Sequence, residues 1–578
     1  MSELEALFDA SCDERRIRRA MRKADRRGWT MPWWVRLPAG ERLYLLKLNG
    51  RHPLRLMGSP DPVLPGDPRR GADWLAGRQA WDPARRPLPD RRDPWAPGEL
   101  EPATAEALQR FSWLSDIAQA TRAEEAQAHA TGWTAAWLKR YGRWGGARDW
   151  HPLHTAERLA NWFCHASLVL SSSDLVYRSA VIDSMARQAR HLHHQLHRLS
   201  PEVLPGEDVA MVAVALAMAG LLLPYGEAWR KAGLDALNHH LFRSRDSTGA
   251  PVSRRPQEAF ATVQRLLMLE RCFRERGEDC PRWLTEARQH LVRFLLAFRL
   301  ESGWAHVQGL GSIPADALDA LLTEARVDLV VPQRGESGGF VRLKARRTVV
   351  LFDGGPPPPP GFPEATAGLL AFEMADGARR LIVNMGPLAI DGERLGAPTA
   401  AHSTIVVGDR NACPVTADGL AAHPLQSWLW QGETAAGYLA GARHDGYRSR
   451  VGLDVERRLL LARDGRGLIG EDALLAAETG RRSQSREEVT FTIRFHLHPD
   501  VEPIPTQGGN RVMLRAGVDR AWSFSLEGVE GVDDIALTIE DSLFVAEQGP
   551  VPTRQLVIAG RRAAPAARCR WQLQRSDG

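Results

Sequence analysis

The spacing of apolar residues changes near Gly339, and this change constrains the fold more than any other feature of the sequence. Between about Thr104 and Arg326, apolar residues recur every three or four positions, as in AERLANWFCHASLVL and PQEAFATVQRLLMLERCFRERG. This is the period of an α-helix. After Gly339 the period is two, in short runs separated by turn residues, such as FVRLKARRTVVLFDGG and EVTFTIRFHLHP. The pattern predicts a helical domain followed by an antiparallel β-sandwich.

The helical segments follow one another with short links at glycine, proline or Ser-Asp. Such a succession favours an incomplete α/α toroid or an α-solenoid over a four-helix bundle. One segment, VAMVAVALAMAGLLLP, is apolar nearly all round, so we expect a helix that is buried on every side. The predicted fold class is therefore multidomain α+β, an incomplete α/α toroid followed by an antiparallel β-sandwich.

The chain has 578 residues, which is too long for one ordinary core. Residues 1–102 are rich in proline, arginine and tryptophan, and prolines this frequent exclude long helices. We expect an extended arm over 1–102, anchored by its tryptophans. The toroid domain is predicted over 103–335 and the β-sandwich over 336–578.

The formal net charge of +5 is a mild excess for this length and does not indicate a nucleic-acid partner. The segment from Asp13 to Arg27, DERRIRRAMRKADRR, is strongly basic. It is a solvated helix face, a patch for a membrane surface or an anionic polymer, or a nucleic-acid arm. No apolar run approaches the ~18 residues of a membrane span, and the N-terminus lacks the apolar core of a secretory signal. We expect no transmembrane segment.

The 6 cysteines are scattered and form no CxxC pair, so we expect neither a disulfide framework nor a zinc knuckle. No phosphate-binding glycine loop and no GxSxG motif is present.

Several segments between about residues 105 and 575 resemble the heparinase II/III-like polysaccharide lyases, in a branch like that of alphaproteobacteria. They are YRSAVIDSMARQARHL, GGFVRLKARRTVVLFDGGPPPPPG, LLAFEMADGARRLIVNMG, AAHSTIVV, HDGY and RFHLHPD. The resemblance implies an α/α toroid with a β-sandwich, and β-elimination on a uronic-acid-containing polysaccharide. It also implies a place in the periplasm or cell envelope, although the absence of a visible export signal leaves the cytoplasm open.

β-Elimination needs a group that neutralises the uronate carboxylate, a base for the C5 proton and an acid for the leaving oxygen. The matched positions depart from the family's pattern. Glu207 and Asp208 stand where the family has an Asn-His pair, and Glu258 follows the retained Arg254 where the family has a catalytic tyrosine. The acids at positions 207 and 208 disfavour a bound carboxylate unless one of them is protonated.

The family's metal-binding set is also altered. Glu364 and Thr366 replace two histidines, and Asn384 replaces an aspartate, so that His402 of AAHST alone is retained. A single histidine does not hold zinc, and we expect no metal and no cofactor. His402 is a corner residue bonded to backbone, a metal ligand or a residue of a substrate cleft. We expect it to orient a loop or ligand.

Two further groups of residues are candidates. His444 and Tyr447 are predicted in a turn between strands, as a structural turn or as a His-Tyr pair at a sugar cleft. His496 and His498 are expected to be solvent-facing strand residues. In the helical domain, Arg158, Asn161, Trp162 and His165 form either a polar rim of the core or a lining for an acidic glycan, to which Arg254 and Arg255 add positive charge.

The sequence thus favours a polysaccharide lyase, with His402 or His444 near the proton and Arg254 or Arg158 on the carboxylate, or with Glu207 as the base. One alternative is a non-catalytic glycan-binding or envelope-assembly protein on a lyase scaffold. The other is a glycoside hydrolase using two of Glu207, Asp208 and Glu258, which would need a carboxyl separation of ~5–9.5 Å. The expected partner is an acidic polysaccharide or oligosaccharide. The oligomeric state stays open.

Overall fold

The computed structural model describes residues 35, 40–120, 122–143, 149–199, 206–325, 331–360, 362–390, 392–421, 425–477, 489–506, 508–517 and 520–576, with the backbone alone for 206 and 207. The basic segment 13–27 lies outside these residues. The chain divides into two compact units. Met1–Ser244 with Ala261–Arg288 is called the helical unit, and Arg245–Phe260 with Gln289–Gly578 the sheet unit. Residues 289–335 thus fall with the sheets, while the predicted boundaries after 102 and 335 stay predictions.

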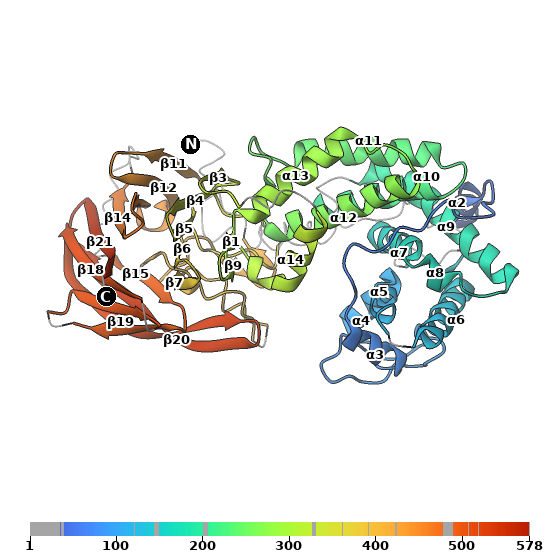
Figure 1. The fold of residues 1–578 in the computed structure, drawn as a ribbon, viewed down its shortest axis with the longest axis horizontal. Helices are drawn as coiled ribbons and strands as arrows, with labels where there is room; N and C mark the ends of the chain where they lie inside the picture. Colours follow the sequence, from blue (N-terminus) through green and yellow to red (C-terminus); the bar gives the residue numbers. More distant parts are fainter. Residues whose placement is uncertain are drawn as a thin grey trace. The chain divides into compact units, whose positions relative to one another are not determined.

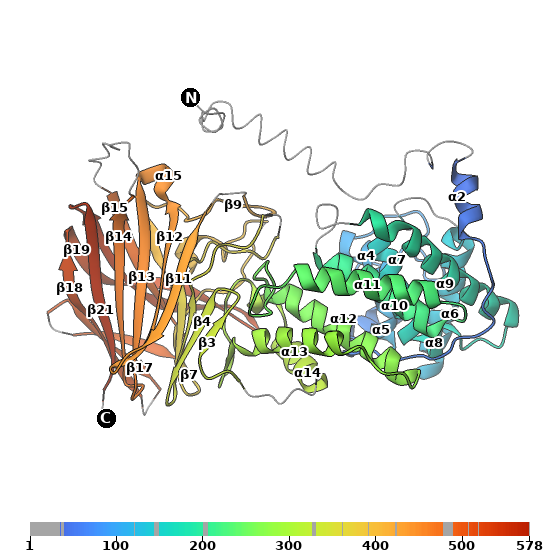
Figure 2. The same cartoon turned by 90° about the horizontal axis from the view of Figure 1, so that it is seen from above.

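The helical unit is built from successive helices, drawn in blue to green in Figure 1 and from a second side in Figure 2. The first three are joined by the long segments 49–67 and 76–101. The chain passes between the units after Ser244 and again inside the helices over 256–275 and 282–296. The helices are α2 (Gly40–Leu48), α3 (Pro68–Leu75), α4 (Pro102–Arg110), α5 (Trp113–Ile117), α6 (Ala123–Tyr141), α7 (Pro152–Cys164), α8 (Ala166–Val169), α9 (Leu175–Gln195), α10 (Gly206–Leu222), α11 (Glu227–Arg243), α12 (Pro256–Glu275) and α13 (Arg282–Leu296).

Helix α10 is the segment that is apolar nearly all round. No residue from Ala210 to Ala219 is more than 4% exposed, which confirms the prediction of a helix buried on every side. Between residues 40 and 101 the chain forms short helices and ordered loops, as the prolines of this segment require. Trp74 and Trp95 anchor this part of the chain: Trp74 packs edge-on against Trp133, and Trp95 stacks on Phe111.

The sheet unit is an antiparallel β-sandwich, as predicted. One sheet has the order β11-β12-β13-β14-β21-β18-β17-β16, and the other β19-β20-β15-β7-β6-β5-β4-β3, with β8 paired to β15. The strands are β3 (Gly335–Ser337), β4 (Phe340–Ala345), β5 (Thr348–Asp353), β6 (Phe372–Asp376), β7 (Arg379–Val383), β8 (Ile405–Val407), β11 (Ser427–Glu433), β12 (Gly437–Tyr447), β13 (Leu453–Ala462), β14 (Gly467–Ala476), β15 (Val489–Leu497), β16 (Val501–Pro505), β17 (Arg511–Ala516), β18 (Ala521–Glu530), β19 (Val532–Ala546), β20 (Gly549–Arg562) and β21 (Ala566–Ser576).

Side chains from both sheets form one core in this unit. Phe352 and Met374 come from one sheet, and Leu459 and Trp571 from the other, and all are buried. Alternation along each strand explains this arrangement, because every second side chain faces the opposite sheet. Shorter elements of the unit are β1 (Arg299–Leu300), β2 (Gly303–Trp304), η5 (Leu310–Ser312), α14 (Ala315–Glu324), η6 (Thr399–Ala401), β9 (Val415–Thr416), β10 (Gly419–Leu420) and α15 (Arg448–Val451).

Across the part of the chain that is described, no helix has both the length and the apolar character needed to cross a membrane.

Candidate functional site

A cavity of about 340 Å³ opens among loops of the sheet unit, and His402 is one of its lining residues. The loops that form it are the segment after β2, the residues that precede β6 and the long connection from β7 to η6. Its polar lining residues are His306, Gln308, Glu364, Thr366, Arg394 and His402.

His402 is held at the end of η6 by the backbone around it. Its Nδ1 lies 2.9 Å from the carbonyl oxygen of Pro398, and its side chain packs against Gly368. A Cβ atom at position 368 would lie 2.5 Å from Cδ2 of the imidazole, so this close approach requires glycine. The next two residues fix the strand entry, because the hydroxyl of Ser403 donates to Val383 O and that of Thr404 to Leu369 O.

These contacts fix the protonation state of His402. A carbonyl oxygen only accepts hydrogen bonds, so Nδ1 carries the proton and donates it to Pro398. Burial lowers the pKa of His402 to about 4, and the imidazole is therefore neutral near pH 7. Its Nε2 then carries a lone pair and can accept a hydrogen bond.

Asn384 and Thr366, two of the positions at which the resemblance implied metal ligands, belong to a hydrogen-bond network. Asn384 accepts from Ser403 N at 2.9 Å and donates through Nδ2 to His306 O at 3.1 Å. Thr366 donates to Gln308. Among the described residues, no three His, Cys, Asp or Glu side chains lie close enough together to hold a metal ion.

Two arginines and one glutamate set the charge of the cavity. Arg255 pairs with Glu364, and its guanidinium lies 3.7 Å from the ring centroid of Phe362. Arg394 donates instead to the backbone oxygens of Thr416, Gly419 and Ala365. Backbone carbonyls satisfy the hydrogen bonds of Arg394 without cancelling the positive charge of its guanidinium.

Arg254, predicted on the substrate carboxylate, is buried in a structural ion pair with Asp353. It also donates to Gly338 O at 2.6 Å and stacks over Phe340 at 4.4 Å. Glu258 is buried as well and accepts from the Ser253 hydroxyl at 2.6 Å. The side chain of Glu207 lies outside the described residues.

His444 and Tyr447 lie within strand β12, not in a turn as predicted, and the strand is irregular between them. His444 accepts from Gly446 N at 3.1 Å, and burial lowers its pKa to about 4. The Tyr447 hydroxyl donates to Arg410 O at 3.0 Å, and burial raises the pKa of the phenol. Neither residue lines the cavity of His402. The prediction that His496 faces solvent is wrong, because it is 2% exposed and bonded to Ser542 and Ala400 O.

In the helical unit, three of the four predicted glycan contacts are core residues. Arg158 is fully buried, donates to Gln188 and lies over Trp137, and Trp162 is fully buried too. His165 is hydrogen-bonded to Ser115 at 2.9 Å, and burial lowers its pKa to about 4. Of these four residues, Asn161 lines a cavity within the helical unit.

Sequence reasoning missed Arg394, Gln308 and His306 as lining residues of the His402 cavity. Arg394 stands eight positions before His402 in DGERLGAPTAAH, so proximity in the sequence was a usable signal. Gln308 and His306 come from a loop about a hundred residues away, and no local pattern marks them.

Comparisons with known proteins agree with this architecture. Residues 331–572 match the family Heparinase II/III-like, C-terminal. A crystal structure of heparinase III superposes with a TM-score of 0.67 at 13% identity, covering 93% of this chain and 90% of that one. Heparan sulfate lyase HepC from Pedobacter heparinus gives 0.60 at 15% identity, over 84% and 78% of the two chains.

A curated relative matches over nearly the whole length. FtsZ-localized protein C of Caulobacter vibrioides (strain NA1000 / CB15N) is 27% identical over 552 residues, which is 92% of each chain. The similarity to this relative therefore includes both units.

Proposed function

For a chain that combines a heparinase II/III-like C-terminal domain with the heparinase III fold, we propose binding of an acidic saccharide without β-elimination. The site of binding is the cavity of His402. The observation that carries the proposal is the separation of the residues predicted for elimination. His402 lines the cavity, whereas Arg254, His444 and Tyr447 are buried in other contacts.

The guanidinium of Arg394 supports an acidic ligand. Arg255 pairs with Glu364 and lies 3.9 Å from Glu258, and both imidazoles of the lining are neutral near pH 7, because burial lowers the pKa of His306 to about 3 and that of His402 to about 4. Arg394 lines the cavity with its hydrogen bonds directed to backbone oxygens, and its positive charge attracts a carboxylate or sulfate group.

Calorimetric titration with a uronic-acid oligosaccharide tests this proposal. Arg394→Gln removes the charge, and we expect its affinity to fall about tenfold, which corresponds to ~1.4 kcal/mol. The matched control is Arg515→Gln, because Arg515 is 57% exposed and pairs with an equally exposed Glu502. Wild-type protein that binds no uronate, or an Arg394→Gln variant that binds as well as wild type, would overturn the proposal.

One observation favours elimination as a second candidate. His402 lines the cavity, and the lone pair of its Nε2 could take the C5 proton of a bound uronate. In that case the product would be an unsaturated uronate, formed by wild-type protein and lost in His402→Gln.

The similarity to FtsZ-localized protein C supports a further role, association with FtsZ in the cell. Co-sedimentation of the purified chain with FtsZ polymers, and the position of a fluorescent fusion relative to FtsZ, test it. A chain that stays in the supernatant and is spread evenly through the cell would contradict this role.

A further inference from the structure

The helical unit has a cavity of its own, about 400 Å³ in volume, lined from α4, α7, α10, α12 and the loop that precedes α4. Its lining includes one exposed aromatic ring, Trp81, together with charged and amide side chains. Lining residues with an aromatic, charged or amide side chain include Trp81, Glu106, Arg110, Glu157, Asn161 and Gln264.

Trp81 differs from the buried tryptophans around it. Its side chain is 43% exposed, and the guanidinium of Arg70 lies 4.5 Å from its ring centroid. A large aromatic ring at the rim of a cavity offers apolar area at a low cost in conformational entropy. The apolar C–H face of a sugar ring is one partner for such a surface.

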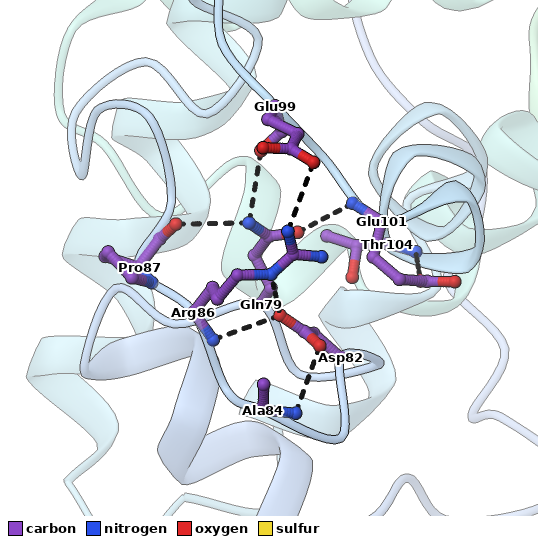
Figure 3. Close-up of polar contacts among 8 residues, drawn as sticks. All are labelled: Gln79, Asp82, Ala84, Arg86, Pro87, Glu99, Glu101 and Thr104. Atoms are coloured by element: carbon purple, nitrogen blue, oxygen red, sulfur yellow. Dashed lines mark hydrogen bonds and ion pairs between the residues drawn. The ribbon is translucent and has the colours of Figure 1, made fainter.

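A dense hydrogen-bond network holds the loop that carries Trp81, as Figure 3 shows. On one side of Trp81, Gln79 donates to Pro87 O and Glu99 O and accepts from Glu101 N at 2.8 Å. On the other side, Asp82 accepts from Arg86 Nε at 2.6 Å and from Ala84 N at 3.0 Å. These bonds hold the loop on both sides of Trp81, at Gln79 and at Asp82.

The polar groups of the cavity match hydroxyl groups. Arg110 is shared between two carboxylates, with Nη2 at 2.9 Å from Glu106 and Nε at 3.0 Å from Glu157. Asn161 donates to Arg110 O at 2.9 Å, and the amide of Gln264 also lines the space. Such a lining offers donors and acceptors side by side, which suits a ligand whose groups both donate and accept.

The charged side chains of this cavity balance one another, whereas Arg394 of the His402 cavity bonds to backbone oxygens. Its two carboxyl groups, Glu106 and Glu157, stand beside two guanidinium groups, Arg110 and Arg265, and Arg110 pairs with both carboxyl groups. A lining with balanced charges gives a uronate or sulfate no net attraction, whereas an uncharged sugar needs none.

We propose that this cavity binds an uncharged saccharide unit stacked on Trp81. The ligand class therefore differs from that of the His402 cavity, and the inference does not depend on the function proposed for that cavity.

Calorimetric titration of the full chain tests it, with N-acetylglucosamine oligomers and maltohexaose as uncharged probes and oligogalacturonate as the acidic probe. Trp81→Ala should weaken binding of an uncharged probe about tenfold, and Trp81→Tyr should largely retain it. The control is Trp428→Ala, since Trp428 on β11 is also 43% exposed, and this variant should bind as wild type does.

The acidic probe separates this inference from the proposed function. Oligogalacturonate binding should be unchanged in Trp81→Ala and reduced in Arg394→Gln, with the opposite result for the uncharged probe. The inference is overturned if neither uncharged probe binds, if Trp81→Ala binds an uncharged probe as tightly as wild type, or if Trp428→Ala weakens it equally.

Discussion

Arg254 and Asp353 form an ion pair in which each side chain is only 5% exposed, although 99 residues separate them in the chain. Arg254 has φ of 59°, a backbone conformation that costs a residue with a side chain about 1–3 kcal/mol. The pair, with the bond from Arg254 to Gly338 O, compensates this cost and joins the segment before α12 to the end of β5. Its role is structural.

Asp353→Asn should lower the stability of the protein strongly. The substitution leaves the guanidinium of Arg254 buried without its counter-charge, and breaking a buried pair in this way typically costs about 3–5 kcal/mol. Chemical denaturation followed by circular dichroism measures the change. Glu502→Gln breaks an exposed pair and should cost about 0–1 kcal/mol. Equal effects of the two substitutions would contradict a structural role for the buried pair.

Gly368→Ala should displace the His402 imidazole and weaken binding in its cavity. The new methyl group would lie 2.5 Å from Cδ2 of His402, so the ring must move. We expect at least about a tenfold loss of affinity for an acidic oligosaccharide, by calorimetry. The control is Gly432→Ala, because an added Cβ there meets nothing within 4 Å. Unchanged affinity in Gly368→Ala would place the ligand elsewhere.

Stability should fall in acid because of buried histidines. Burial lowers the pKa of His402 from 6.5 to about 4, so between these values the unfolded chain binds a proton that the folded chain does not. His402 therefore leaves the unfolding free energy unchanged above about pH 6.5 and lowers it progressively as the pH falls toward 4. In His402→Gln, the unfolding free energy should depend less steeply on pH, by about 1.4 kcal/mol per pH unit between these limits. A slope equal to that of wild type would show that the imidazole titrates normally in the folded protein.

Tyr447→Phe should affect stability and not saccharide binding. The substitution removes a buried hydrogen bond to Arg410 O, which is worth about 0.5–1.5 kcal/mol. Thermal unfolding and calorimetric titration of the same variant separate the two effects. Loss of binding without loss of stability would return Tyr447 to the candidate site.

Much of the fold could be predicted because it depends on local spacing. The period of two after Gly339 predicted the sandwich, and the all-apolar segment of α10 predicted a fully buried helix. The turn predicted at His444 is wrong for a local reason. Asp445 and Gly446 favour turns, but they form only an irregularity in β12, because pairing with β13 resumes beyond them at Tyr447.

The candidate site was harder to predict because its determinants are non-local. An arginine pair at 254 and 255 has the same sequence whether it faces a ligand or a buried acid. Its partners, Asp353 and Glu364, lie about a hundred residues away, and only the folded chain brings them together. His402 was identified because the AAHST motif marks it. The role of Gly368 was not, because nothing in the sequence near it shows that the absence of a side chain at this position makes room for the His402 imidazole.

Binding of an acidic saccharide in the His402 cavity, without cleavage, is tested most directly by incubating wild-type protein and His402→Gln with a panel of uronic-acid polysaccharides. Binding and the ultraviolet absorbance of unsaturated uronate are measured in the same samples. We expect wild-type protein to bind and the absorbance not to rise. A rise in absorbance that His402→Gln abolishes would contradict this expectation and establish β-elimination at this site.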